Sequence, residues 1–129
     1  MHVLRQVQRS LRDDGLMLEI HPTGDEFAVR AGARGLGFVD TSAFDRVLEA
    51  MEDGVRQVVA DGLFVELQTL RRHVIERFDT AAELLEEAER WENLRLPSAL
   101  RRRLRSAHES PVELIDTVVY RLFRKGSPA

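Results

Sequence analysis

Cysteine is absent from this chain of 129 residues. Its absence excludes disulfide bonds, thiolate catalysis, cysteine-ligated zinc and iron–sulfur clusters. The chain has only one Trp and one Tyr, so it offers no run of aromatic side chains on which nucleic-acid bases would stack. No apolar run approaches the roughly 20 residues that cross a membrane, and no secretory signal opens the sequence. We therefore expect a cytoplasmic protein with no membrane partner.

Basic residues are slightly fewer than acidic residues. The chain has 19 Lys and Arg residues against 22 Asp and Glu residues, a net charge of −3 at pH 7. Proteins that bind the nucleic-acid backbone are usually basic, so we expect no nucleic-acid partner. The apolar fraction of 43% and the charged fraction of 32% are those of an ordinary folded protein. The length predicts one domain over residues 1–125, followed by a frayed tail at 126–129.

The first 40 residues predict one helix and three short strands. Apolar side chains recur at helical spacing between positions 1 and 14, and Gly15 follows as a helix cap. The mostly apolar residues 16–20 then predict a buried strand that ends before Pro22. Two further strands, at 26–30 and 36–40, predict a hairpin with one solvent-facing side. We interpret this hairpin as an insertion over about residues 25–41.

The middle of the chain predicts a long amphipathic helix and an ambiguous segment. The helix begins at Thr41 or Ser42 and ends near Gly62, since apolar residues follow the three-and-four rhythm between them. Residues 63–78 are rich in apolar and β-branched side chains. For this segment we favour two strands that bend at the central arginines, and the alternative is a continuation of the helix.

The last third predicts two helices and a closing strand. Thr80 and Glu83 form a capping box that begins one helix, because each side chain can satisfy a free backbone donor. Another helix runs from Pro97 to about His108, and residues 112–124 form a long strand rich in β-branched side chains. The predicted fold class is therefore α/β or α+β, with mixed or antiparallel strands packed by three to four helices.

Three segments resemble the C-terminal half of class I SAM-dependent methyltransferases. The opening VLRQVQRSLRDDGLMLEIHP resembles the helix, turn and strand that lead into the fifth strand of that family, with Asp13 and Asp14 where Pro and Gly usually stand. The segment RFDTAAELLEEAERW is similar to the helix before the last strands, and VELIDTVVYRLFRK is similar to the closing strand. The resemblance implies a partial methyltransferase-like sheet and the C-terminal half of such an enzyme.

The cofactor-binding half of that family has no counterpart in the sequence. No G-x-G-x-G motif occurs, and Gly32, Gly35 and Gly37 fall in the predicted hairpin. We therefore expect the isolated chain to bind no cofactor, and to use SAM only if a partner chain supplies the other half. Because a half-sheet leaves an edge unprotected, we expect a homodimer or a partner chain to cover it.

Three functions remain open at this point. The first is a non-catalytic binding or assembly module that is methyltransferase-like in sequence. The second is a subunit or truncated form of a methyltransferase that acts on a small molecule together with a partner chain. The third is a small independent α+β ligand-binding protein. The sequence therefore does not decide whether the chain is an enzyme, and its catalytic candidates are His21, Glu19 and Asp25.

His21 is the main catalytic candidate, because it directly follows the first predicted strand. Either Glu19 or Asp25 could orient its imidazole and make an acid/base pair. The alternative is an exposed turn histidine with no role.

Arg71, Arg72 and His73 are the candidates for substrate binding. Guanidinium groups match the geometry of carboxylates and phosphates, so this run could contact an anionic substrate. The alternative is that these three residues form the solvated face of a strand pair. No two of the four histidines lie four residues apart, so the sequence predicts no metal site.

Overall fold

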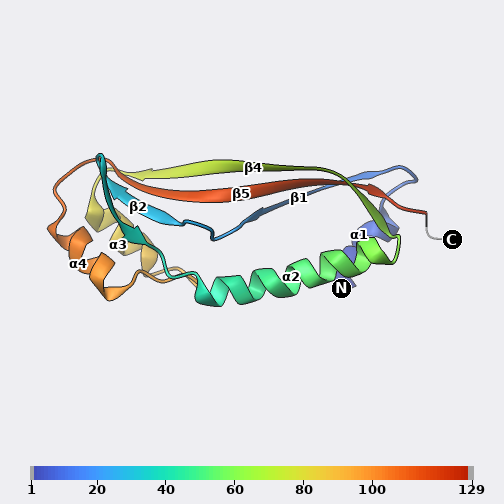
Figure 1. Cartoon of the computed structure of the whole chain (residues 1–129), viewed down its shortest axis with the longest axis horizontal. Coiled ribbons are helices and arrows are strands. Elements are labelled where there is room, and N and C mark those ends of the chain that lie inside the picture. The colour runs from blue at the N-terminus through green and yellow to red at the C-terminus, as the bar shows by residue number, and fades with distance from the viewer. Residues whose placement is uncertain (1, 128–129) are drawn as a thin grey trace. The chain divides into compact units, whose positions relative to one another are not determined.

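Residues 2–127 are described by the computed structural model, and nine helices and strands follow one another along them (Figure 1). In chain order they are α1 (His2–Ser10), β1 (Leu16–Pro22), β2 (Ala28–Ala31), β3 (Arg34–Phe38), α2 (Ser42–Ala60), β4 (Phe64–Phe78), α3 (Ala81–Ala88), α4 (Ser98–Ser106) and β5 (Val112–Lys125). The strands form an antiparallel sheet in which β5 pairs with β1, β2 and β4, and β3 pairs with β2. The fold class is α+β.

Contacts between residues divide the chain into two compact units. Unit 1 consists of the residues up to Pro22, Arg46–Arg72 and the residues from Val118 onward. Unit 2 consists of Thr23–Asp45 and His73–Thr117. The long elements α2, β4 and β5 each contribute residues to both units, and each unit has its own hydrophobic core.

Unit 1 packs helices α1 and α2 against one face of the strands β1 and β5 and against Phe64 at the start of β4 (Figure 1). β1 and β5 run antiparallel from the pair Leu16 and Arg124 to the pair Pro22 and Val118. The core of this unit consists of buried aromatic and valine side chains from α2, β4 and β5: Val55, Val58, Phe64 and Phe123. Alternate residues of a strand point to opposite faces, so only one face of β1 and β5 reaches this core.

Unit 2 packs helices α3 and α4 against the β2–β3 hairpin and the first part of β5. β2 pairs with β5 from Ala28 and Ile115 to Ala31 and Val112. The largest fully buried aliphatic side chains of its core come from β2, α3, α4, β5 and the segment before α4: Val29, Leu84, Leu96, Leu100, Leu104 and Val112. These elements join residues that are far apart in the chain, so the core forms only when the hairpin, both helices and β5 come together.

The predicted capping box is present at the start of α3. The Thr80 hydroxyl accepts a hydrogen bond from the backbone N–H of Glu83 at 3.3 Å. The Glu83 carboxylate accepts a bond from the N–H of Asp79 at 3.0 Å, one residue earlier than the capping-box pattern places it. Both ends of the motif therefore satisfy free backbone donors, which is why the helix begins here.

The expectation that residues 16–20 form a buried strand is wrong in one respect. The strand is present, but Leu16, Leu18 and Ile20 are 54% to 58% exposed. Met17 packs against the core of unit 1 on the opposite face. An apolar strand next to one layer of helices buries only one of its faces, so the composition alone overstated its burial.

The segment 63–78 is one continuous strand, β4, and neither alternative predicted for it is correct. The strand does not bend into two, and it does not continue the helix. The boundary between the units nevertheless falls between Arg72 and His73, at the arginines where the bend was expected.

Several other predictions about elements are confirmed. The long helix, the hairpin, the helix after Pro97 and the closing strand are all present, although α1 ends at Ser10, earlier than expected. Of the predicted frayed tail, Gly126 donates a backbone hydrogen bond to Leu63 at 2.8 Å, and residues 128–129 lie outside the described residues. Within residues 2–127, no helix is both long and apolar enough to cross a membrane.

Candidate functional site

His21 belongs to a charged network on the helix-facing side of unit 1. Its Nδ1 lies 2.5 Å from Oε1 of Glu19, and its Nε2 lies 3.7 Å from Oε1 of Glu52 on α2. Residues 19 and 21 share a face of β1 because alternate residues of a strand point the same way. Of the two carboxylates that the sequence offered to His21, the structure brings Glu19 to it.

Arg121 is the cation of this network, and the sequence analysis did not identify it. Its Nε donates to Glu19 at 2.8 Å, while Nη1 and Nη2 donate to the two carboxylate oxygens of Glu52 at 2.9 and 2.6 Å. Its side chain is only 10% exposed. Burial lowers the pKa of Arg121, but the bonds to Glu19 and Glu52 outweigh burial and raise it above the ordinary value.

The bonding of this network favours a structural role over acid/base chemistry. Glu19 uses one oxygen for His21 and the other for Arg121, and both oxygens of Glu52 contact Arg121. All four carboxylate oxygens therefore have a partner from the protein itself. None of these residues lines the depression around Leu18 and Leu70 in unit 1 or the pocket around Arg30 in unit 2. The network joins α2 to β1 and β5 through charge-assisted hydrogen bonds.

Asp25, the other carboxylate considered for His21, belongs to unit 2. Its electrostatic neighbour there is Asp116, whose carboxylate accepts a hydrogen bond from the N–H of Thr117 at 2.7 Å. Burial raises the pKa of Asp116, and the nearby charge of Asp25 adds to the increase, while hydrogen bonds from Thr117 and Gly24 oppose it. Asp116 is therefore destabilised when it is ionised.

We expect Asp116→Asn to stabilise the protein at pH 7 by less than about 1 kcal/mol, because solvent screens a half-exposed group. A raised pKa means that the folded state binds the proton more tightly than the unfolded state. The wild-type protein therefore gains stability as the pH falls through the folded pKa, and the advantage of the variant shrinks. Urea unfolding followed by Trp91 fluorescence at neutral and acidic pH measures this difference. An advantage that stays constant with pH would contradict the prediction.

The candidates Arg71, Arg72 and His73 lie in the middle of β4, and all three are exposed. Nδ1 of His73 lies 3.5 Å from the hydroxyl oxygen of Thr117 on β5. Arg71 and Arg72 are consecutive residues of a strand, so their side chains leave opposite faces of the sheet. Arg71 and Arg72 belong to unit 1 and His73 to unit 2, and none of the three lines the depression around Leu18 in unit 1 or the pocket around Arg30 in unit 2.

The face of unit 1 turned away from its helices is apolar and open to solvent. We call it the open face and define it by Leu16, Leu18, Ile20, Gln68, Leu70, Tyr120 and Leu122. Leu18 pairs with Leu122 across the strands, and Ile20 pairs with Tyr120. Five residues of this face (Leu18, Gln68, Leu70, Tyr120 and Leu122) line a shallow depression of about 180 Å³. These seven residues are uncharged, and charged residues border them: Arg124 pairs with Leu16, and Glu66 and Arg72 flank Gln68 and Leu70 on the same side of β4.

Strand β4 is exposed over most of its length and lies at an edge of the sheet. It pairs with β5, and thirteen consecutive residues, Val65 to Arg77, are exposed. In the part of the chain that the structure describes, no other strand pairs with β4. It is therefore an edge strand, and such a strand presents free backbone groups to a partner.

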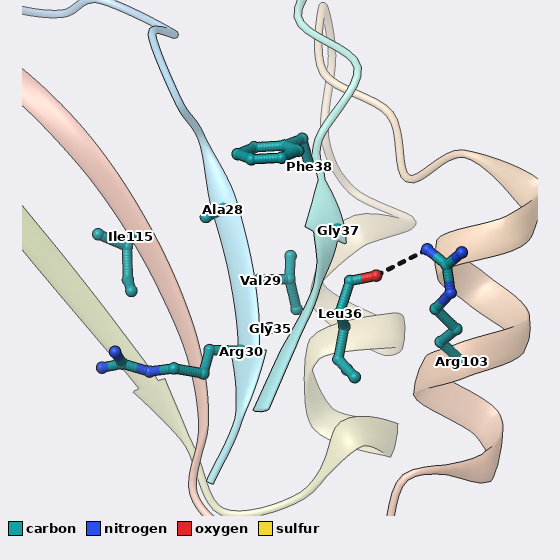
Figure 2. A pocket seen from close by; sticks show the side chains of 9 residues that line it. All are labelled: Ala28, Val29, Arg30, Gly35, Leu36, Gly37, Phe38, Arg103 and Ile115. Carbon is teal, nitrogen blue, oxygen red and sulfur yellow. Dashed lines mark hydrogen bonds between the residues drawn. The ribbon is translucent and has the colours of Figure 1, made fainter. Parts of the chain in front are cut away.

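A second candidate lies in unit 2, where the β2–β3 hairpin borders a pocket of about 590 Å³ (Figure 2). Arg30, Phe38 and Arg103 are among its lining residues. Among residues 2–127, no group of three His, Asp or Glu side chains is placed to hold a metal ion.

Comparison with known proteins gives no match to a family model, a curated protein or a solved structure. The likeness to class I methyltransferases therefore depends on the three sequence segments alone and stays a prediction. The open face of unit 1 and the pocket of unit 2 are the two features from which a function can be inferred.

Proposed function

We propose that this chain is a non-catalytic assembly module that forms a homodimer through the open face of unit 1. The observation that carries the proposal is the exposure of Leu16, Leu18 and Ile20, each more than half exposed and adjacent on one face of β1. Single exposed apolar side chains are ordinary, but contiguous apolar surface usually marks a site of association.

The orientation of β1 supports this proposal. Glu19 and His21 are turned toward α2, where Arg121 neutralises the carboxylate, while the leucines face solvent. A strand of a free-standing monomer would be expected to do the reverse, because burial stabilises leucine and ionised groups are costly to bury. The protein has a buried charge network where an apolar core would be simpler, and this leaves the apolar face available for a second molecule.

The lack of charge at the centre of the open face, around Leu18 and Leu122, favours a second copy as the partner. In a two-fold symmetric dimer each surface packs against itself, so a charged residue near the axis would meet its own twin. The central pairs Leu18–Leu122 and Ile20–Tyr120 have no such residue, and Arg124 lies at the end of the face beside Leu16. Sheets commonly pack face to face with interdigitating side chains. The depression beside Leu18 and Leu70 offers room for an apolar side chain of the partner.

The competing candidate is the methyltransferase-like one, in which a partner chain carrying a cofactor half covers the same face. It requires that the isolated chain stay monomeric until that partner is present. The homodimer requires only the chain itself, so the oligomeric state of the purified protein separates the two candidates.

We expect Leu18→Gln to weaken dimerisation at least tenfold, because two glutamines would replace two leucines near the centre of the interface, and tenfold corresponds to about 1.4 kcal/mol. Sedimentation equilibrium at micromolar concentration measures the association constant. Val47→Gln is the matched control, since Val47 is a similarly exposed apolar residue of unit 1 that lies on α2 and outside the open face.

A wild-type protein that stays monomeric over the whole micromolar range would overturn the dimer. Equal weakening by Leu18→Gln and Val47→Gln would show that the open face is not the interface. Calorimetric titration with SAM tests the non-catalytic part of the proposal, and tight binding by the isolated chain would contradict it.

A further inference from the structure

The pocket of unit 2 has an apolar floor. Ala28 pairs with Phe38 on one side and with Ile115 on the other, so the three side chains share one face of the sheet. Figure 2 shows the Phe38 ring above Ala28, with Ile115 across β2 from it. The volume of about 590 Å³ lies within the range typical of small-molecule sites.

A glycine keeps this pocket open. Gly35 pairs with Arg30 across the hairpin, and a Cβ placed on Gly35 would meet no atom within 4 Å. Any larger residue at this position would extend into free space on the pocket side of β3. Phe38 is 62% exposed, which is unusual for a phenylalanine and leaves its ring available for stacking.

Arg30 is one of two charged groups that line the pocket, and its cross-strand partner Glu113 on β5 fixes its position. Its Nε and Nη2 donate to Oε1 of Glu113 at 3.1 and 2.6 Å, which uses two of the five N–H donors of a guanidinium. Nε of Arg77 donates to the other oxygen of Glu113 at 2.8 Å. These bonds from Arg30 and Arg77 lower the pKa of Glu113, so the carboxylate stays ionised at neutral pH.

The charge around the pocket is positive. Glu113 is only 7% exposed and is shared by two arginines, so this group of three side chains carries a net charge of +1. Arg103 of α4 also borders the pocket, on the other side of the hairpin (Figure 2), and donates to the carbonyl of Leu36 at 2.8 Å. None of the nine residues that line the pocket is acidic.

We propose that this pocket binds a small molecule with one carboxylate and a flat apolar or aromatic body. The carboxylate pairs with Arg30 and balances the net positive charge that Arg30, Glu113 and Arg77 share. The body lies on Ala28 and Ile115 and stacks on Phe38. Guanidinium and carboxylate groups make strong charge-assisted pairs, and aromatic pairs add to the binding energy of the buried area. The proposal is independent of the dimer, because every pocket residue belongs to unit 2.

The probe that tests the proposal is 2-naphthoate, followed by amide chemical shifts in two-dimensional NMR. We expect saturable shifts at the amides of Ala28, Gly35 and Phe38. Gly35→Leu fills the pocket, and we expect it to weaken binding at least tenfold. Ala82→Leu is the matched control, because it adds the same side chain at an exposed position of α3 in the same unit. We expect this control to bind as the wild type does.

The neutral analogue 2-naphthylmethanol tests the role of Arg30, and we expect it to bind at least tenfold more weakly than 2-naphthoate. Phe38→Ala provides a second variant whose folding is not at risk, since Phe38 is exposed, and it should also weaken binding. Equal affinity for the acid and the alcohol would overturn the assignment of a carboxylate. Unchanged binding by both Gly35→Leu and Phe38→Ala, or no saturable binding by the wild type, would overturn the site.

Discussion

Replacing Arg121 with Ala is expected to lower the free energy of unfolding by about 3–5 kcal/mol, because it leaves two partly buried carboxylates without their cation. In the wild-type protein Arg121 donates three hydrogen bonds, one to Glu19 and two to Glu52. After the substitution His21 is the only residue of this network that still contacts the two carboxylates. Urea unfolding followed by circular dichroism measures the loss.

Arg124→Ala is the matched control for this experiment. Arg124 lies on the same strand but is exposed, and such surface substitutions usually change stability by less than about 0.5 kcal/mol. Adding Glu19→Gln and Glu52→Gln to Arg121→Ala should recover part of the loss, since neutral amides need no cation. If the triple variant is no more stable than Arg121→Ala alone, unpaired charge is not the cause of the destabilisation.

The second large effect is expected at Phe123, where substitution by Ala should cost about 3–5 kcal/mol through lost burial and a residual cavity. Phe123 is completely buried, and its ring meets that of Phe64 edge-on with centroids 6.0 Å apart and an interplanar angle of 67°. The guanidinium carbon of Arg121 lies 5.7 Å from the centre of the same ring. The phenylalanine therefore supports both the core of unit 1 and the charged network.

Leu122→Ala is the control for Phe123→Ala, because Leu122 is the next residue on β5 and points to the open face. We expect it to change the stability of the monomer much less than Phe123→Ala, and to weaken dimerisation. Urea unfolding at low protein concentration measures the first effect and sedimentation equilibrium the second. Equal losses of monomer stability for the two variants would contradict the assignment of faces on β5.

The Arg121→Ala variant also bears on the role of His21. If the network only fastens α2 to the strands, His21→Gln should preserve the fold and the dimer, and Arg121 should dominate the stability of unit 1. The bonding of all four carboxylate oxygens of Glu19 and Glu52 within the network is the reason for favouring a structural role. The other predicted binding residues, Arg71, Arg72 and His73, are exposed on β4, and the side chains of Arg71 and Arg72 leave opposite faces of the strand.

Much of the fold could be predicted because it depends on neighbours along the chain. The rhythm of apolar residues predicted α2, and β-branched residues predicted β5. The Thr80 hydroxyl predicted the start of α3 because its hydrogen bond spans only three residues. The proximity of His21 and Glu19 was predictable for the same reason, since alternate residues of any strand share a face.

The sequence by itself therefore determined an α/β or α+β fold class, the order of the helices and strands outside residues 63–78 and the shared face of Glu19 and His21, because each follows from periodicity or short-range hydrogen bonding. Only the tertiary structure decided that Arg121 lies opposite Glu19, since that register joins residues about 100 positions apart. It also decided which face of β1 the helices cover. Alternation marks two different faces of a strand, but the packing of α1 and α2 selects the polar one and leaves Leu16, Leu18 and Ile20 open.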